Sequence, residues 1–404
     1  MNNEINKVVV MGQGYIGLPT AALIAQHKVE VIGVDTKNEV VETINKGKIH
    51  IVEPALEGLV KNVVERGFLK ASLQVEEAEV FVITVPTPFV GNYQPDISFV
   101  EAASKAVIPF LKAGNLFIIE STSPVGTTEK IAKLIFSERP ELIDNLYIAY
   151  CPERVLPGRI IYELENNDRV IGGIDSKSAE KAVRFYNIFV KAALHKTNAK
   201  TAEMCKLTEN SSRDVNIAFA NELSLICDKA GIDVWELISL ANKHPRVNIL
   251  QPGTGVGGHC IAVDPWFIVA DFQEEARIIR TAREINNYKT SWVIAKIEKE
   301  IEAYFQKFGE KPTVALMGLA FKPDIDDLRE SPAVSVANAL KDKEKANVLV
   351  CEPNISSWKK GKLTDCLVAF NEANIVVYLV SHREFRLLPA IPEKIVLDFC
   401  GVKK

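Results

Sequence analysis

Short, almost uniformly apolar runs recur along the first half of the chain. They span residues 8–11, 29–34, 80–85, 116–120, 147–150, 170–173 and 193–197. A helical pattern over residues 18–26 follows the first run. Apolar runs that alternate with helices are typical of parallel strands buried on both faces, so the pattern predicts an α/β domain.

Longer helical patterns begin at residue 201. They cover residues 201–229, 233–242 and 273–308, and the last contains neither glycine nor proline. At 1.5 Å per residue, a helix of that length reaches about 50 Å. Beyond it, apolar runs at 313–317, 347–351, 374–380 and 395–398 repeat the layout of the first domain, with a helix after Ser331-Pro332.

A glycine motif, Gly12-Gln13-Gly14-Tyr15-Ile16-Gly17, lies between the first apolar run and its helix. Glycines there allow a pyrophosphate to approach the helix N-terminus, whose partial positive charge attracts it. Asp35 ends the next run, eighteen residues after Gly17. A carboxylate at that position accepts hydrogen bonds from a ribose 2′-hydroxyl and repels a 2′-phosphate, so we expect NAD. The turn after the run at 313–317 has only Gly318 of such a motif and should not hold a dinucleotide in this way.

The composition excludes several other classes of function. The chain has 404 residues, of which 25% are charged, and a formal net charge of -4, so no basic field attracts nucleic acid or a membrane surface. No apolar run is long enough to span a membrane, and the N-terminus leads directly into a strand without room for a signal peptide. The seven cysteines are scattered and none forms Cys-x-x-Cys, so we expect reduced thiols, no metal and a cytoplasmic protein.

Candidate chemistry concentrates in the stretch Gly255-Val256-Gly257-Gly258-His259-Cys260. Three glycines in four positions let main-chain N–H groups crowd around a small group beside the Cys260 thiol. Asp264 follows four residues later, and Pro265 favours an extended conformation at Asp264. A thiol and an acid in such a pocket suit covalent catalysis at a carbonyl carbon. A packed cysteine in a glycine-rich turn remains the alternative.

Polar side chains elsewhere admit two interpretations each. Lys206, Asn210 and Arg213 fall on one stripe of the helix predicted at 201–229, either a row that faces a ligand or a solvated face. The threonine-rich segments 86–89 and 121–128 follow apolar runs. They either face a cofactor at the carboxyl ends of parallel strands or serve as turn residues.

Together these motifs resemble the UDP-glucose/GDP-mannose 6-dehydrogenase family over nearly the whole chain. Within the family, residues 151–158, His244-Pro245-Arg246 and residues 258–266 are most similar to members that act on UDP-N-acetyl-D-mannosamine. Those members supply a uronic acid for bacterial surface polysaccharides. The resemblance implies an α/β fold of two Rossmann-like doubly wound domains joined by a helical segment with a long central helix. We place their boundaries at residues 1–198, 199–310 and 311–404.

The resemblance also implies the reaction and its residues. A sugar 6-hydroxyl is oxidised to a carboxylate with two NAD+ and one water, through a covalent adduct on Cys260. The implied catalytic residues are Cys260, Lys206, Asp264, Thr122, Glu153 and Asn210. The implied NAD contacts are Gly12, Gly14, Tyr15, Ile16, Gly17, Asp35, Thr87, Thr128 and Arg329. The implied UDP-sugar contacts are Arg154, Val155, Lys206, Asn210, Arg213, His244, Arg246, Gly257, Phe321 and Lys322.

The family resemblance further implies a homodimer in which Arg246 reaches the neighbouring subunit's substrate. Three alternatives stay open. The same chemistry could act on UDP-N-acetylglucosamine, UDP-N-acetylgalactosamine or UDP-glucose; the protein could bind a nucleotide without catalysis; or it could be a hydroxyacid dehydrogenase. The last would need neither Cys260 nor a third, nucleotide-binding domain.

Overall fold

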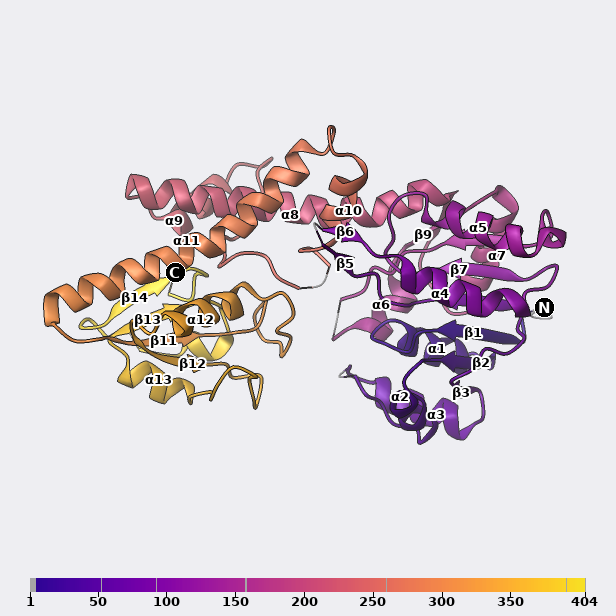
Figure 1. Cartoon of the computed structure of the whole chain (residues 1–404), viewed down its shortest axis with the longest axis horizontal. Helices are drawn as coiled ribbons and strands as arrows, with labels where there is room; N and C mark the ends of the chain where they lie inside the picture. The colour runs from indigo at the N-terminus through magenta and orange to yellow at the C-terminus, as the bar shows by residue number, and fades with distance from the viewer. Residues whose placement is uncertain are drawn as a thin grey trace. The chain divides into compact units, whose positions relative to one another are not determined.

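The structure of the protein is a computed structural model that describes residues 5–51, 53–91, 93–156, 158–258, 260–389 and 391–403. The chain divides into two compact units, Met1–Glu209 and Asn210–Lys404. Each unit contains its own parallel or mostly parallel sheet with helices packed on it (Figure 1). Pro157 and His259, which belong to two of the motifs above, lie outside the described residues.

The first unit is built on an eight-stranded sheet with the order β10-β9-β8-β7-β4-β1-β2-β3. Its strands are β1 (Lys7–Met11), β2 (Glu30–Val34), β3 (Leu69–Ser72), β4 (Val80–Ile83), β7 (Leu116–Ile119), β8 (Tyr147–Tyr150), β9 (Arg169–Gly173) and β10 (Leu194–Asn198). All neighbouring pairs are parallel except β8 and β9. The strand order reverses between β1 and β4, which is where ligands bind to sheets of this kind.

Alternating side chains of each strand supply two cores, one on each face of this sheet. Val8 and Val10 of β1 pack on one face, whereas Val9 and Met11 pack on the other. The first face is covered by α1 (Gly17–Gln26), α2 (Asn38–Asn45), α3 (Leu56–Glu65), α6 (Ile160–Asn166) and α7 (Ser176–Tyr186). The second is covered by α4 (Ser98–Val107) and α5 (Thr127–Glu138). All seven apolar runs expected here are strands; β3 and the small hairpin of β5 (Phe89–Val90) and β6 (Gln94–Pro95) were not expected.

The second unit combines long helices with a four-stranded parallel sheet of order β12-β11-β13-β14. The strands are β11 (Thr313–Met317), β12 (Asn347–Cys351), β13 (Ile375–Tyr378) and β14 (Ile395–Asp398). The helices are α8 (Ala199–Ala230), which begins in the first unit, and α9 (Val234–Ala241), α10 (Asp264–Asp271), α11 (Arg277–Phe308), α12 (Pro332–Lys343), α13 (Cys366–Glu372) and α14 (Arg383–Arg386). The predicted long helix is therefore confirmed as α11, and the predicted α/β fold with two Rossmann-like sheets is confirmed as well.

Helices α11 and α12 pack on one face of this smaller sheet, and α13 packs on the other. Figure 1 shows α11 as a long orange helix above the yellow and orange strands of the sheet. Val293 and Ile297 of α11 meet Val314 and Leu316 of β11 in the first of these cores. Within the described part of the chain, none of the helices combines the length and the apolar character that crossing a bilayer requires.

One cysteine pair corrects the sequence-based expectation. Cys351 at the end of β12 and Cys366 at the start of α13 form a disulfide, whereas reduced thiols were expected throughout. The expectation rested on the absence of close cysteine spacing, but these two residues are fifteen apart. The packing of α13 against β12 brings them together, and this contact is set by the tertiary fold. The other five cysteines, Cys260 among them, are thiols.

Candidate active site

The glycine turn between β1 and α1 has the geometry of a dinucleotide cradle. Gly12 has a φ of 91°, and a Cβ on Gly17 would lie 1.8 Å from the carbonyl oxygen of Gly12, so neither position accepts a side chain. At Gly14, by contrast, no atom of the described residues lies within 4 Å of such a Cβ. The turn is thus tight where the chain folds back and open where a pyrophosphate would approach the start of α1.

Asp35 lies beside this turn, as expected of a ribose-binding acid. Its Oδ2 accepts a hydrogen bond from the backbone N–H of Gln13 at 3.0 Å, and its Oδ1 accepts one from Lys37 at 3.0 Å. The side chain stays half-buried, so lone pairs remain for a ligand. Gln13 of the same turn is buried, and its side-chain amide donates to the carbonyl of Val10 at 2.9 Å. These residues fit NAD at the switch point of the sheet.

The loops after β4 and β7 are joined to each other. The Thr87 hydroxyl donates to the carbonyl oxygen of Thr122 at 2.5 Å, and the Ser121 hydroxyl donates to that of Val85 at 2.6 Å. Thr87 and Thr122, expected at the cofactor and at the reacting group, are therefore adjacent. Thr128 is buried at the start of α5, where its hydroxyl donates to Glu203 of α8 at 2.6 Å. Tyr15 is 38% exposed and Ile16 is half-buried beside the glycine turn.

Behind Glu153 lies a buried charged cluster that the sequence did not reveal. Nη2 of Arg169 contacts Oε2 of Glu153 at 3.0 Å, and Nη1 lies 3.7 Å from Oε1 of Glu120. Glu120 accepts a hydrogen bond from the Tyr186 hydroxyl at 2.6 Å. Burial raises the pKa of Glu120 to about 7, although Arg169 opposes the rise. The Arg169 guanidinium therefore pairs with both Glu153 and Glu120 and fixes the carboxylate of Glu153.

Two cysteines beside predicted site residues have opposite environments. Burial raises the pKa of the Cys151 thiol to about 12, so Cys151 is protonated and chemically inert at neutral pH. Cys260 is half-buried in the turn four residues before the start of α10, and its carbonyl oxygen accepts the backbone N–H of Asp264 at 2.8 Å.

Asp264 is the first residue of α10, and Pro265 follows it within the first turn. The extended conformation expected of Asp264 is wrong. Proline is tolerated in the first turn of a helix, because the N–H group that it lacks would have no acceptor within the helix. Asp264 is buried, and its Oδ2 accepts a hydrogen bond from Nδ2 of Asn210 at 2.5 Å. The structure thus joins two predicted catalytic residues, Asn210 and Asp264, near the chain position of Cys260.

The glycines before Cys260 are required mainly by packing. A Cβ on Gly257 would lie 2.6 Å from the carbonyl oxygen of Glu330 and 2.8 Å from Cβ of Phe321. The backbone N–H of Gly258 donates to the carbonyl of Arg329 at 3.0 Å. This N–H is bonded within the protein, so it is not one of the main-chain N–H groups expected around a small group beside Cys260. The same packing brings Gly257 against Phe321, both of which are predicted sugar-nucleotide contacts.

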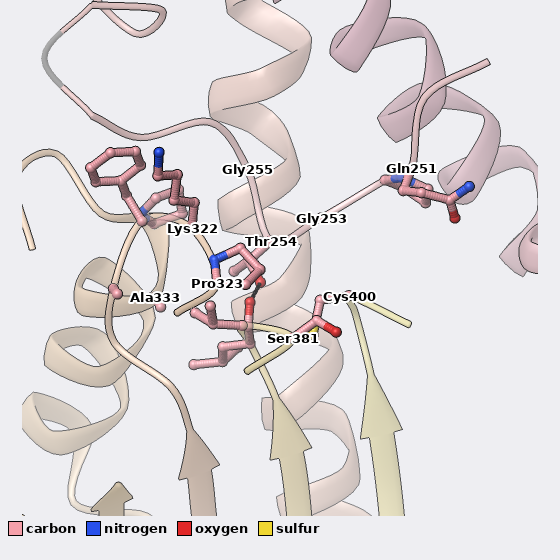
Figure 2. Close-up of a pocket in the computed structure, with 15 residues that line it drawn as sticks. Gln251, Gly253, Thr254, Gly255, Lys322, Pro323, Ala333, Ser381 and Cys400 are labelled. Carbon is pink, nitrogen blue, oxygen red and sulfur yellow. Dashed lines mark hydrogen bonds between the residues drawn. The ribbon is translucent and has the colours of Figure 1, made fainter. Parts of the chain in front are cut away.

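A cavity of about 210 Å³ lies at the carboxyl ends of β11 and β13 (Figure 2). Its lining comes from the segments 251–255, 320–323 and 379–381 and from Pro332, Ala333 and Cys400. The cavity lies at the switch point of this sheet, since β12 and β13 flank β11 on opposite sides. Phe321 and Lys322, two of the predicted contacts of a nucleotide sugar, are among its lining residues. Gln251, Ser381 and Cys400 also line the cavity, although no sequence motif pointed to them.

The segment that leads to Cys260 is held against this cavity by three contacts. The Thr254 hydroxyl donates to the carbonyl of Leu379 at 2.7 Å, and Figure 2 shows this bond across the cavity wall. The Thr290 hydroxyl donates to the carbonyl of Thr254 at 3.1 Å, and Gly253 donates its N–H to Asn221 at 2.9 Å. Helices α8 and α11 therefore fix the backbone that lines the cavity.

The turn after β11 is occupied by an internal acid. Oε2 of Glu352 accepts the backbone N–H groups of Leu319 and Ala320 at 2.7 and 2.9 Å. Burial alone would raise the pKa of Glu352, but its hydrogen bonds, with His382 and these N–H groups, hold it below its usual value. A carboxylate thus accepts the turn's N–H groups, which a dinucleotide phosphate would approach in the corresponding glycine turn of the first unit.

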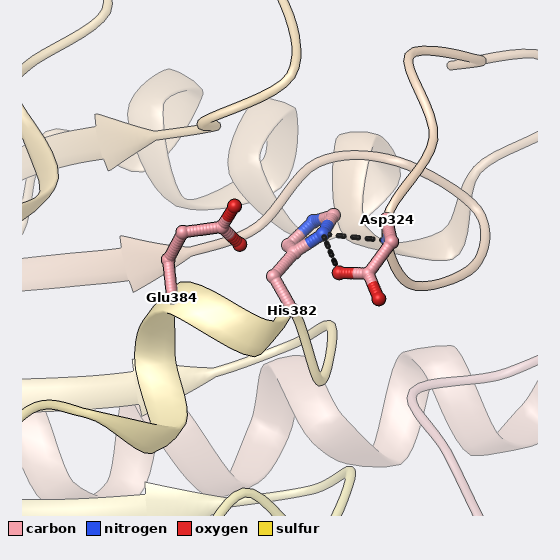
Figure 3. Close-up of side chains that lie close together, drawn as sticks. All are labelled: Asp324, His382 and Glu384. Carbon is pink, nitrogen blue, oxygen red and sulfur yellow. Dashed lines mark hydrogen bonds and ion pairs between the residues drawn. The ribbon is translucent and has the colours of Figure 1, made fainter.

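His382 completes this arrangement (Figure 3). Its Nδ1 accepts the backbone N–H of Asp324 at 2.9 Å, and its Nε2 lies 3.0 Å from Oε2 of Glu352. Asp324, His382 and Glu384 offer ligand atoms within 4.8 Å of one another. Both ring nitrogens of His382 are already engaged, so the group serves to join three loops rather than to bind a metal.

The remaining predicted contacts are described by their own surroundings in each unit. Arg154 pairs with Glu209, with Nη2 at 2.8 Å from Oε1, and Val155 is half-buried beside it in the chain. Arg213, His244 and Arg246 are exposed, the last two in the loop after α9. Arg329, which was predicted to contact NAD, pairs with Asp327 at 2.6 Å, and Lys206 is half-buried on α8.

Comparison with known proteins agrees with this geometry. Models of the UDP-glucose/GDP-mannose dehydrogenase family match residues 6–190 as its NAD binding domain, 200–288 as its central domain and 315–404 as its UDP binding domain. A UDP-N-acetyl-D-mannosamine dehydrogenase of Campylobacter jejuni is 55% identical and covers 98% of this chain and 100% of its own.

Two further proteins are similar to this chain over nearly its whole length. An NDP-N-acetyl-D-galactosaminuronic acid dehydrogenase of Ralstonia nicotianae is 49% identical, over 99% of this chain and 96% of its own. The solved structure of UDP-D-ManNAc dehydrogenase from Pyrococcus horikoshii is 38% identical, with a TM-score of 0.88 over 98% of this chain and 96% of its own. The expected family resemblance and the expected use of NAD are confirmed.

Proposed function

Because the chain belongs to the UDP-glucose/GDP-mannose dehydrogenase family, we propose that it oxidises the 6-hydroxyl of UDP-N-acetyl-D-mannosamine to a carboxylate. The observation that carries this proposal is the position of Cys260 in the turn before α10, with Asp264 in the first turn of that helix and bonded to Asn210. The choice of sugar is supported by relatives of that name at 55% and 52% identity.

The role of Cys260 follows from the number of electrons removed. Bound NAD+ supplies the two-electron oxidant for each of two steps. The first step converts the alcohol into an aldehyde, and the Cys260 thiolate then forms a C–S bond to the aldehyde carbon. The resulting thiohemiacetal still carries a hydrogen on that carbon, so a second oxidation gives a thioester.

Water then breaks the C–S bond, which releases the carboxylate and restores the thiol. In total, one alcohol, two NAD+ and one water give one carboxylate, two NADH and three protons. A binding protein without catalysis has no use for such a thiol.

The other catalytic roles are assigned by chemistry. Lys206 stabilises negative charge on the reacting oxygen and favours the thiolate of Cys260. Asp264, fixed by Asn210, and Thr122 orient the water that attacks the thioester. Glu153 assists proton transfer from this water; its carboxylate is supported from behind by Arg169.

The nucleotide part of the substrate belongs to the second unit. The cavity of about 210 Å³ combines apolar walls with Lys322, whose ammonium can meet a phosphate as a point charge. Gly257 packs against Phe321 and belongs to the proposed contacts of the nucleotide sugar. The proposal further includes Arg154, Val155, Arg213 and His244. We also propose a homodimer in which Arg246, exposed in the loop after α9, contacts the partner's substrate.

Turnover of a panel of UDP-sugars tests the proposal. We expect purified protein to form two NADH per uronate from UDP-N-acetyl-D-mannosamine, with less activity on UDP-N-acetylglucosamine, UDP-N-acetylgalactosamine and UDP-glucose. Cys260→Ser abolishes uronate formation while NAD+ binding stays nearly intact. Cys227→Ser, at a buried thiol of α8, is the matched control and keeps activity.

Each other outcome points elsewhere. Turnover confined to UDP-glucose or to another sugar of the panel rejects the mannosamine substrate. The relative from Ralstonia makes UDP-N-acetylgalactosamine the first alternative to test. A protein that binds UDP-sugars yet never reduces NAD+ is a nucleotide-binding regulator instead.

A further inference from the structure

Glu203 is a buried acid that the proposed reaction does not use. It lies on α8 with 0% of its surface exposed. Its Oε2 accepts the backbone N–H of Gly126 at 2.6 Å. Its Oε1 accepts the backbone N–H of Thr128 at 2.7 Å and the Thr128 hydroxyl at 2.6 Å. One carboxylate from α8 therefore takes three donors from the first residues of α5, all within the first unit.

These contacts account for the charge of a buried acid. The first N–H groups of a helix have no partner within the helix, and the helix dipole favours an anion there. Burial raises the pKa of Glu203, while the bonds from Thr128 and Gly126 work against the rise. Gly126 has a φ of 92°, which permits the turn that aims its N–H at the carboxylate.

The loop held in this way carries a residue of the proposed reaction. It connects β7 to α5 and contains Thr122. Internal bonds stiffen it: the Ser123 hydroxyl donates to the carbonyl of Ser121 at 2.9 Å, and the Thr127 hydroxyl donates to that of Pro124 at 2.7 Å. Its first part is bonded to Thr87, as described above. A displacement of the Gly126 end would therefore be transmitted to Thr122.

Glu203, the α8 side of this contact, lies close to Lys206 along the same helix. Glu203 and Lys206 are three residues apart on α8, so they lie on neighbouring positions of one helix face. We propose that Glu203 is a positioning residue that fixes the loop of Thr122 against the turn of α8 that carries Lys206. The inference rests on the proposed function, because it assigns Thr122 and Lys206 to one reaction.

Glu203→Gln is the sharpest perturbation of this contact. Glutamine keeps the shape of the side chain but replaces one acceptor oxygen with an NH2 donor. In one orientation this donor faces the N–H of Gly126, and in the other it faces that of Thr128. At least one bond must be lost in either case. A surface pair joins the same two helices, Lys200 and Glu129 at 3.0 Å, so Glu129→Gln is the matched control.

The first measurement is steady-state kinetics with UDP-N-acetyl-D-mannosamine and NAD+. Misplacement of a catalytic group by a fraction of an ångström to 1 Å lowers kcat by about 10- to 100-fold. We expect that loss for Glu203→Gln, with KM for both substrates within about threefold of wild type. Glu203→Asp, which keeps the charge but retracts it, should fall between the two, and Glu129→Gln should match wild type.

The second measurement is hydrogen exchange at Gly126 and Thr128, which needs no activity. Both amides should be protected in the wild type and should exchange about tenfold faster or more in Glu203→Gln, as loss of a buried hydrogen bond implies. It also covers the case in which Glu203→Gln folds poorly, since Glu203→Asp can then be compared with wild type in the same way.

The outcomes separate the two proposals. A folded Glu203→Gln with wild-type kcat overturns the positioning role, and so does unchanged exchange at both amides. A wild type that oxidises no UDP-sugar overturns the proposed function, and the positioning role with it, even if the exchange data show that Glu203 holds the loop.

Discussion

The stability of Gly257→Ala tests whether close packing requires a glycine at this position of the loop before Cys260. A Cβ at this position would lie 2.6 Å from the carbonyl oxygen of Glu330, 2.8 Å from Cβ of Phe321 and 2.8 Å from Cδ of Pro332. None of these atoms is the end of a flexible side chain. The methyl group can be accommodated only if the segments around Phe321 and Pro332 move away.

The cost follows from the number of rigid contacts. Inserting a methyl group into a packed site costs about 1–3 kcal/mol, and three unyielding contacts place Gly257→Ala at the upper end. For a unit of this size, that loss lowers the melting temperature by about 5–10 °C. Because Phe321 lines the cavity, its displacement should also raise KM for the UDP-sugar more than it lowers kcat.

Gly253→Ala is the matched control for stability. It lies on the same segment, and the nearest described atom to its Cβ would be the carbonyl oxygen of Gly255 at 3.7 Å, an ordinary contact. Differential scanning calorimetry of both variants should show a large loss for Gly257→Ala and little for Gly253→Ala. Equal melting temperatures would refute the packing argument and restore the view of Gly257 as part of an open cradle.

Two further predictions concern the helices of the second unit and the dimer. Burial lowers the pKa of Lys289 from its usual 10.5 to about 7. Below pH 7 the charged ammonium therefore reduces the free energy of unfolding by up to about 5 kcal/mol, and this cost disappears as the pH rises towards 10.5. The hydrogen bond from the Lys289 ammonium to the Ser224 hydroxyl at 2.6 Å and the contact with the ring face of Trp292 at 4.1 Å offset part of this cost. We therefore expect Lys289→Met to be more stable than wild type at pH 6 and to lose this advantage by pH 10. Urea unfolding of both proteins at both pH values tests the direction of the difference. If Arg246 contacts the partner's substrate, mixing inactive Arg246→Ala with inactive Cys260→Ser should restore activity, since each mixed dimer then has one complete site. No activity in mixed dimers, isolated by two affinity tags, would refute the contact between subunits.

The apolar pattern predicts the sheets well because buried parallel strands have a simple signature. The runs at 8–11 and 313–317 both form central strands, and Asp35 lies beside the glycine turn as the spacing requires. β3 was not predicted, because its sequence alternates too briefly for a half-buried edge strand to stand out. Helix α10 was not predicted, because Pro265 argues locally against a helix that the surrounding packing permits.

Contacts between distant segments could not be predicted from one sequence. Glu203 is an ordinary polar position in a helical pattern, and only the fold shows that the start of α5 meets it. The disulfide between Cys351 and Cys366 and the wall that Gln251 adds to the cavity have the same origin. The glycines before Cys260 were predicted as a feature, but their cause is the segment around Phe321, some sixty residues away in the chain.

The two sheets use one design in opposite ways. Each has an acid after its second strand, Asp35 in the first unit and Glu352 in the second. Asp35 accepts one N–H from its glycine turn and remains half-buried, so it can still accept a ribose hydroxyl. Glu352 is buried and accepts two N–H groups from the turn after β11, with His382 against the same oxygen.

Consequently the second turn has its anion built in. A phosphate placed there would meet a carboxylate at a few ångströms, and like charges at that distance repel strongly in a buried setting. A dinucleotide is therefore excluded from the second sheet by charge as well as by the missing glycines. In the proposed site, the phosphates of a nucleotide sugar are met instead by the lining of the cavity, to which Lys322 contributes a cation and the segment 251–255 contributes backbone. This division lets two related sheets hold two different nucleotides without competition.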